Sequence, residues 1–182
     1  RVLRLCVLDI APTLDMYKRT DMDFARAYYH WFHLIQPTPL PERMIGGNVL
    51  HYLHAKLGGW GSGTTTFIEP EAMAEYERSL TLAPEQAGDI LPAVHTACED
   101  YRASAGIDLV HDQESRDTGQ KVRCDLLVLW GDRGVVHKMF KPLELWQAQC
   151  AANVTGHVVP SGHFIPEELP DLTIESLRTF MA

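Results

Sequence analysis

The last third of the chain alternates apolar runs with helical segments, and this alternation limits the fold more than any other feature. The runs at 125–130 and 155–160 have the length of strands, and they flank a helical segment at 142–152. A second helix is expected over 171–181. Strand, helix, strand, loop and helix in this order are typical of an α/β protein with a parallel sheet.

An earlier apolar run, from Val2 to Leu8, predicts another strand of the same sheet. Its near-continuous apolar character favours a strand that is buried on both faces. The run ends at Asp9. Because open α/β sheets bind ligands at the carboxyl ends of their strands, Asp9 is expected at the ligand-binding edge.

Between residues 16 and 105 the sequence changes in character, and no strand is predicted there. The segments 15–29 and 70–82 are expected to be helical, whereas the prolines of 37–41 and the glycines of 58–63 interrupt the helical pattern. The simplest interpretation is a helical cap inserted over the ligand-binding edge of the sheet. The expected parts are therefore a core strand with the acid loop at 1–15, a helical cap at 16–105 and the rest of the core at 106–182.

Composition excludes several classes of function. The 182 residues suit about one domain, and the net charge of −8, from 16 basic and 24 acidic residues without a basic cluster, argues against a nucleic-acid surface. No apolar run is long enough to span a bilayer, and no charged-then-apolar leader opens the sequence. Four widely spaced cysteines without a C-x-x-C pair predict a reduced, cytoplasmic protein rather than a zinc site or a disulfide framework.

A histidine in the loop after the last strand is the first candidate for chemistry. His163, in the sequence SGHF at 161–164, is placed where α/β enzymes hold a general base. A carboxylate that accepts a hydrogen bond from one imidazole nitrogen fixes the tautomer, so that the other nitrogen can take a proton. Asp9 is the preferred carboxylate, and Asp132 is the alternative. The structural alternative is that Asp9 only ends a strand and His163 only caps a helix.

A nucleophile for such a base is missing from the sequence. In a sheet of this type it belongs on a strand-to-helix elbow of the form G-x-S-x-G or its aspartate equivalent. No such pattern occurs, and Ser62 lies among glycines at the wrong offsets. We therefore expect the nucleophile to lie outside this chain.

Four motifs give the sequence a recognisable character: VLDIAPT at 7–13, YHW at 29–31, CEDYRA at 98–103 and SGHF at 161–164. In this order they resemble the haloacetate (fluoroacetate) dehalogenases of the α/β-hydrolase superfamily, over nearly the whole chain. The resemblance implies the C-terminal part of an α/β-hydrolase fold, with parallel strands, flanking helices and a helical cap insertion. The N-terminal half of that family, with its nucleophilic aspartate and the arginines that bind the substrate carboxylate, has no counterpart here, so this fragment alone should lack turnover.

The resemblance also implies roles for individual residues. His163 would activate water, and Asp9 would orient His163. The halide pocket would be formed by His30, Trp31 and Tyr101, and Trp60 would line the substrate cavity. The substrate implied is a short haloacid, with no metal and no other cofactor, and many members of the family are homodimers. An imidazole N–H, an indole N–H and a phenol O–H are the donors that a departing, strongly hydrated fluoride needs.

Several alternatives stay open. Epoxide hydrolases use the same aspartate and histidine, with cap tyrosines as hydrogen-bond donors. A truncated, non-catalytic protein that binds small acids or a partner would also fit the sequence. The cap aromatics and His30 could also be ordinary core residues. The pairs His51–His54 and His30–His33 have the i, i+3 spacing of half a metal site, although packing or surface roles are favoured. The stretch 81–90 is longer than this part of the family's cap usually is, which leaves substrate choice open.

Overall fold

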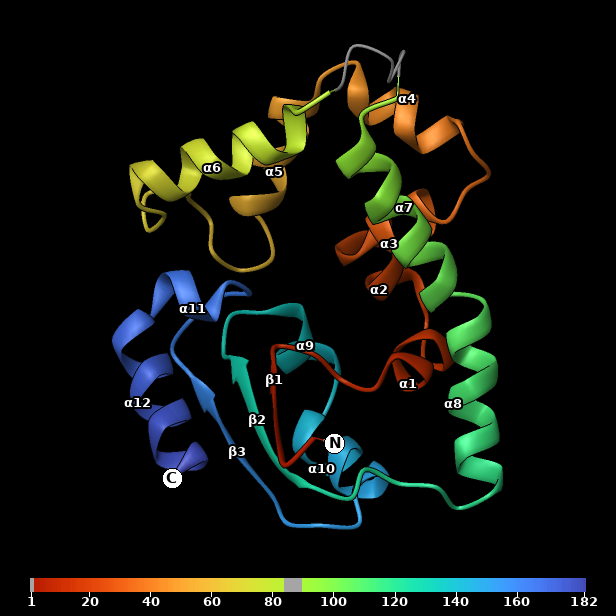
Figure 1. Ribbon diagram of the computed structural model, residues 1–182, viewed down its shortest axis with the longest axis vertical. Coiled ribbons are helices and arrows are strands. Elements are labelled where there is room, and N and C mark those ends of the chain that lie inside the picture. The colour runs from red at the N-terminus through yellow and green to blue at the C-terminus, as the bar shows by residue number, and fades with distance from the viewer. Residues whose placement is uncertain (1, 84–89) are drawn as a thin grey trace.

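The computed structural model describes residues 2–83 and 90–182. Its sheet has three parallel strands in the order β1 (Arg4–Leu8), β2 (Asp125–Gly131) and β3 (Val154–Val159). In the register of the sheet, Leu8 lies opposite Leu129 and Gly131 lies opposite Val159. The carboxyl ends of all three strands therefore meet at one edge, which Figure 1 shows facing the cap helices.

The central strand β2 packs against helices on both faces. Leu126 and Val128 pack in one cluster with Leu143 and Trp146 of the helix α10 (Pro142–Gln149), while Leu127 and Leu129 face α11 (Ile165–Glu168) and α12 (Pro170–Met181). This alternation follows from the two-residue period of a strand. The helix α9 (Val135–Met139) leads from β2 toward α10.

The first strand differs from its prediction. All five residues of β1 are half-buried rather than buried on both faces, and Val2 and Leu3 before it are exposed. The reason is that, among the described residues, β1 has a strand neighbour only on the side of β2. Within these residues its other edge has no strand partner, and such an edge is a place where another strand can pair.

Between β1 and β2 the regular elements that the structure describes are all helices, joined by turns and loops, and this helical insertion is called the cap below. Its elements are α1 (Thr13–Lys18), α2 (Met22–Ala27), α3 (Tyr29–Leu34), α4 (Leu40–Gly46), α5 (Val49–Leu57), α6 (Pro70–Thr81), α7 (Pro92–Ser104) and α8 (Ile107–Asp117). In Figure 1, α5 and α6 lie above α11, and α7 and α8 run along the other side of the molecule. Most of the stretch 81–90 lies outside the described residues.

The helix expected over 15–29 is divided into two. The chain leaves the helical conformation after Lys18, and Asp21 starts α2 by accepting a hydrogen bond from the amide of Phe24 at 2.8 Å. A second change of direction at Tyr28 begins α3. These breaks bring Tyr28, His30 and Trp31 into the interior, where each is buried.

The predicted fold class, parallel strands with flanking helices and a helical insertion, is confirmed. Within the described part of the chain, no helix combines the length and the apolar character needed to cross a membrane.

A buried carboxylate joins two helices of the cap. Glu42 on α4 is fully buried, and its Oε1 accepts hydrogen bonds from the hydroxyl of Thr38 at 3.0 Å and from the guanidinium of Arg102 on α7 at 2.9 Å. Burial alone would raise the pKa of Glu42, but Arg102, His95 and Thr38 bind the ionised form and lower the pKa to about 2. The pair therefore fixes α7, and Tyr101 with it, against α4.

Replacing Arg102 should destabilise the protein because it leaves a buried carboxylate without its cation. We expect Arg102→Ala to lower the free energy of unfolding by about 3 kcal/mol in chemical denaturation. Arg78→Ala is the control, since Arg78 pairs with Glu75 on the surface and its loss should leave the midpoint nearly unchanged. Equal effects of the two changes would contradict the structural role of Glu42.

Candidate active site

The edge of the sheet brings an aspartate and a histidine together. His163 Nδ1 lies 2.7 Å from Asp9 Oδ2, and Asp9 Oδ1 accepts a hydrogen bond from the amide of Gly131 at 3.1 Å. Because a carboxylate only accepts, Nδ1 carries the proton of this bond. Asp9 is fully buried, whereas the side chain of His163 is 29% exposed. The arrangement leaves Nε2 of His163 free to take a proton from a molecule in front of it.

The backbone is strained at two positions of this region. Asp9, with φ of 47°, and Trp60, with φ of 51°, are the non-glycine residues with positive φ in the described part of the chain. Aspartate tolerates this conformation, but it is unfavourable for a bulky tryptophan. Such strain persists only where surrounding contacts hold it, and it concentrates at functional sites.

Glu168 holds the loop that carries His163, and sequence reasoning missed it. Its carboxylate accepts hydrogen bonds from the amides of Gly162 at 2.8 Å and Phe164 at 3.2 Å, which flank His163 on both sides. Burial would raise the pKa of Glu168, but these amides and further donors lower it, so the group is ionised at neutral pH. The only sequence signal was a glutamate five residues after His163, at the end of α11.

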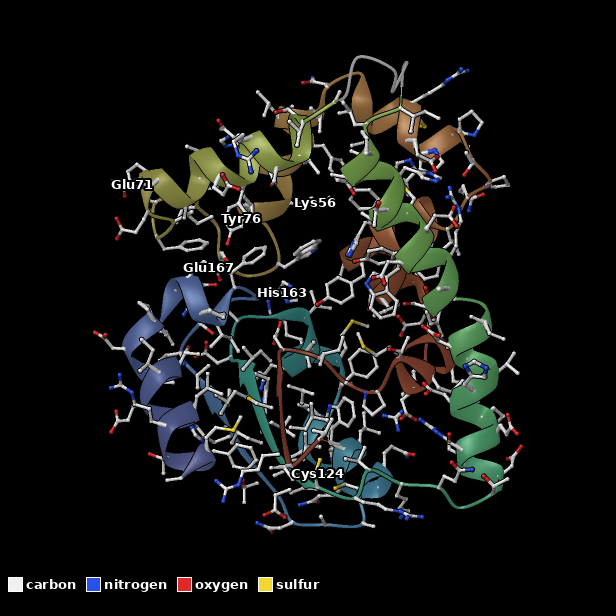
Figure 2. The ribbon with its side chains drawn as sticks, in the orientation of Figure 1. Lys56, Glu71, Tyr76, Cys124, His163 and Glu167 are labelled. Carbon is white, nitrogen blue, oxygen red and sulfur yellow. The ribbon has the colours of Figure 1, made fainter. Side chains whose placement is uncertain are left out.

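The same carboxylate ties the cap to the core. The hydroxyl of Ser62, in the cap segment 58–63, donates to Glu168 at 2.7 Å, and Arg133 donates to it at 2.9 Å. The neighbouring Glu167 accepts from the phenol of Tyr76 on α6 at 2.6 Å. Figure 2 shows Tyr76 and Glu167 facing each other between α6 and α11.

Position 162 requires a glycine because Ser62 lies very close to it, not because of the backbone dihedral angles of Gly162. A Cβ at this position would overlap the backbone amide and hydroxyl of Ser62. The cap segment 58–63 therefore lies directly against the loop of His163, and any side chain at 162 would separate the two.

The aromatic residues predicted for the substrate cavity gather beside His163. The ring of Trp60 lies 5.1 Å from that of His163 and 4.6 Å from that of His30, measured between centroids. Tyr101 lies 5.6 Å from His30 and 6.2 Å from Trp31. The six residues proposed from the sequence thus form one continuous cluster that joins the sheet edge to α3 and α7.

The protonation of the cap groups follows from their burial. Burial lowers the pKa of His30 to about 3, and the nearby side chains of Lys56 and His163 act in the same direction. Burial also raises the pKa of Tyr101 to about 12. At neutral pH His30 is therefore an uncharged imidazole with one N–H, Tyr101 keeps its O–H, and both can donate hydrogen bonds.

Tyr28 is a further member of the cluster that the sequence did not indicate. It is buried, stacks on Trp31 with an interplanar angle of 12° and lies 6.5 Å from the ring of His163. Its phenol oxygen is buried without a hydrogen-bond partner among the described residues. A lone tyrosine at the end of a short helix gives no sequence signal of such a position.

Asp132, the alternative to Asp9 as the partner of His163, does not contact this histidine. The side chain of Asp132 is 45% exposed and lies 3.6 Å from Arg133, not on His163. Two residues later, a Cβ on Gly134 would lie 3.1 Å from one carboxylate oxygen of Asp9 and 3.2 Å from the other. A glycine there leaves room for Asp9 to reach the histidine.

One cluster of side chains has the spacing of metal ligands. Glu42, His95 and Glu99 place ligand atoms within 4.8 Å of one another. The guanidinium of Arg102 already binds both glutamates, so the cluster is part of an ion-pair network. Of the histidine pairs noted in the sequence, His54 binds Glu77 on α6 at 2.7 Å.

This combination of parallel sheet, Asp–His pair at its carboxyl edge and helical insertion matches the C-terminal part of an α/β-hydrolase fold, as the following comparisons show. No family model matches the chain. It is 38% identical over 181 residues to a fluoroacetate dehalogenase from a Burkholderia species, covering 100% of this chain and 56% of that protein.

Solved structures agree on the fold. A protein described as an α/β hydrolase from Nostoc sp. PCC 7120 is 44% identical, with a TM-score of 0.88, over 100% of this chain and 58% of that one. A protein described as an epoxide hydrolase from Pseudomonas aeruginosa is 34% identical, with a TM-score of 0.85, over 98% and 56%. The chain thus spans little more than half the length of these relatives.

Weakening Glu168 should loosen the loop of His163. We expect Glu168→Gln to speed hydrogen exchange at the amides of Gly162 and Phe164 about tenfold, because charge-assisted bonds become neutral ones. Glu167→Gln is the matched control, since Glu167 binds Tyr76 and neither of these amides. Unchanged exchange in Glu168→Gln, measured by NMR, would show that the loop does not depend on this carboxylate.

Proposed function

We propose that the protein carrying this chain is a hydrolase of the haloacetate dehalogenase type, which converts a short 2-haloacid into a 2-hydroxyacid and halide. One observation carries the proposal: the rings of His30, Trp31 and Tyr101 lie together beside Trp60 and His163. The similarity to a fluoroacetate dehalogenase supports it.

In the first step an aspartate carboxylate, supplied from outside these 182 residues, attacks the carbon that bears the halogen. A carbon–oxygen bond forms, the carbon–halogen bond breaks and the halide leaves with the bonding electrons. The product of this step is an ester between the aspartate and the acid. The proposal assigns the halide to His30, Trp31 and Tyr101, whose donors are neutral and can meet the developing negative charge.

In the second step His163 Nε2 takes a proton from water while the water oxygen attacks the ester carbonyl. The tetrahedral intermediate collapses, the hydroxyacid leaves with the proton from His163, and the aspartic acid loses its own proton to solvent. Net products are hydroxyacid, halide and one proton. Asp9 keeps Nδ1 protonated and stabilises the imidazolium that forms in between.

A second candidate function is epoxide hydrolysis. Two tyrosines of the cluster, Tyr28 and Tyr101, have protonated phenols that could donate to an epoxide oxygen, and one structural relative is described as an epoxide hydrolase. Parallel assays with fluoroacetate, chloroacetate and styrene oxide separate the two functions. We expect halide release, and turnover of the epoxide alone would reject the dehalogenase.

We also propose a cytoplasmic location for the protein. Cys6, Cys98, Cys124 and Cys150 are all unpaired, which supports a reducing, cytoplasmic location.

We also propose that the protein forms a homodimer. Size-exclusion chromatography with light scattering tests this oligomeric state.

Removing the base should stop the reaction after its first step. In the protein that carries this chain, we expect His163→Ala to release halide once and then accumulate the ester, which mass spectrometry would detect as a covalent adduct. His157→Ala, on the exposed face of β3, should turn over normally. A folded His163→Ala protein that binds substrate but forms no adduct would argue against His163 as the hydrolytic base.

Removing one halide donor should matter most for fluoride. We expect Trp31→Phe to lower kcat for fluoroacetate about 100-fold, since a preorganised donor stabilises the transition state by about 3 kcal/mol. The loss with chloroacetate should be smaller because chloride is less strongly hydrated. Trp130→Phe, whose indole binds His137 away from the cluster, is the control. Equal losses with both halides would show that Trp31 serves packing rather than halide release.

A further inference from the structure

Arg133 binds three segments that lie far apart in the sequence. It belongs to the loop after β2, which in Figure 1 leaves the strand beside α11 and continues to α9. Its Nε donates to the carbonyl of Gly61 at 3.3 Å, its Nη1 to that of Pro160 at 2.9 Å, and its Nη2 to the carboxylate of Glu168 at 2.9 Å. The guanidinium therefore binds the cap, the loop after β3 and α11 at the same time.

The guanidinium and its carboxylate partner bind complementary groups of the same segments. Arg133 donates to backbone carbonyls, whereas Glu168 accepts from the cap hydroxyl of Ser62 and from the amides on both sides of His163. The backbone amide of Arg133 also donates to the carbonyl of Ser161 at 3.1 Å. One charged pair thus binds donors and acceptors in both the cap segment and the loop of His163.

The guanidinium also holds the strained turn that carries Trp60. Trp60 and Gly61 both have positive φ, of 51° and 96°. Such a turn needs contacts that hold it, and the bond from Arg133 to the carbonyl of Gly61 is one of them. Because the ring of Trp60 lies 5.1 Å from that of His163, a fixed turn also keeps the imidazole in place.

We propose that Arg133 is a positioning residue for the second step of the reaction, and that it keeps the imidazole of His163 aligned by binding Glu168 and the cap segment 58–63 together. For the reaction itself, this proposal rests on the proposed function. Ester formation needs the external aspartate and the halide donors, whereas ester hydrolysis needs the base. Loosening the loop of His163 should therefore slow the hydrolysis of the ester more than its formation.

Rapid-quench mass spectrometry measures the two steps separately. In the protein that carries this chain, we expect Arg133→Gln to slow ester hydrolysis about tenfold, part of what a general base contributes, and to leave ester formation from chloroacetate unchanged. Arg133→Lys keeps a cation beside Glu168 but lacks the fixed fork of a guanidinium, so it should slow the hydrolysis by a smaller factor. Arg78→Gln, which removes an exposed arginine with two bonds to Glu75, is the matched control.

Two results would overturn the proposal. Equal slowing of both steps in folded Arg133→Gln would show that Arg133 only stabilises the fold, and hydrolysis at the wild-type rate would show that the imidazole does not depend on it. If Arg133→Gln does not fold, Arg133→Lys is judged by the same two outcomes.

A measurement without substrate separates this proposal from the proposed function. If the wild-type protein forms no ester with any haloacid, the proposed function fails, and NMR then tests the positioning role. The proton on Nδ1 of His163, which is bound to Asp9, should exchange with solvent about tenfold faster in Arg133→Gln than in the wild type. In Arg78→Gln this exchange should keep its wild-type rate. Unchanged exchange in Arg133→Gln would show that Arg133 does not position His163.

Discussion

The hydrogen bond between Asp9 and His163 is the contact on which the candidate site depends. It joins the end of β1 to the loop after β3, and it requires the three strands to end at one edge, a strained backbone at Asp9 and space beside Gly134. Within the described part of the chain no lysine or arginine pairs with this buried carboxylate, so its negative charge is directed at the imidazole. The position of the candidate base therefore depends on the arrangement of the three strands through this one hydrogen bond.

Two adjacent glutamates connect the cap with this interaction. Glu168 binds the amides on both sides of His163 and also Ser62, while Glu167 binds Tyr76 on α6. Packing within the cap depends in turn on Glu42 and Arg102, which hold the helix of Tyr101. The cluster around Trp60 is therefore supported from the core and from the cap by different charged groups.

Sequence reasoning predicted the strands, their parallel arrangement, the helical insertion and the residues that gather at the edge, because apolar runs and motif order carry that information. It did not predict Glu168, Lys56 or Tyr28 as neighbours of the site. Their positions depend on where α11, α5 and α2 pack, and this is decided by contacts between residues far apart in the chain. The helix expected over 15–29 was interrupted for a local reason, the capping side chain of Asp21. The half-buried state of β1 depends on which strands lie beside it, and an apolar run does not report that.

The close approach of Ser62 to Gly162 has a consequence for motion. Because no side chain separates the cap segment from the loop of His163, the two surfaces form one packed unit. A movement of the cap that admits a ligand either carries this loop along or breaks the hydrogen bond between Ser62 and Glu168. Access to the residues around His163 and alignment of its imidazole would then change together, because both depend on the same contact between cap and core.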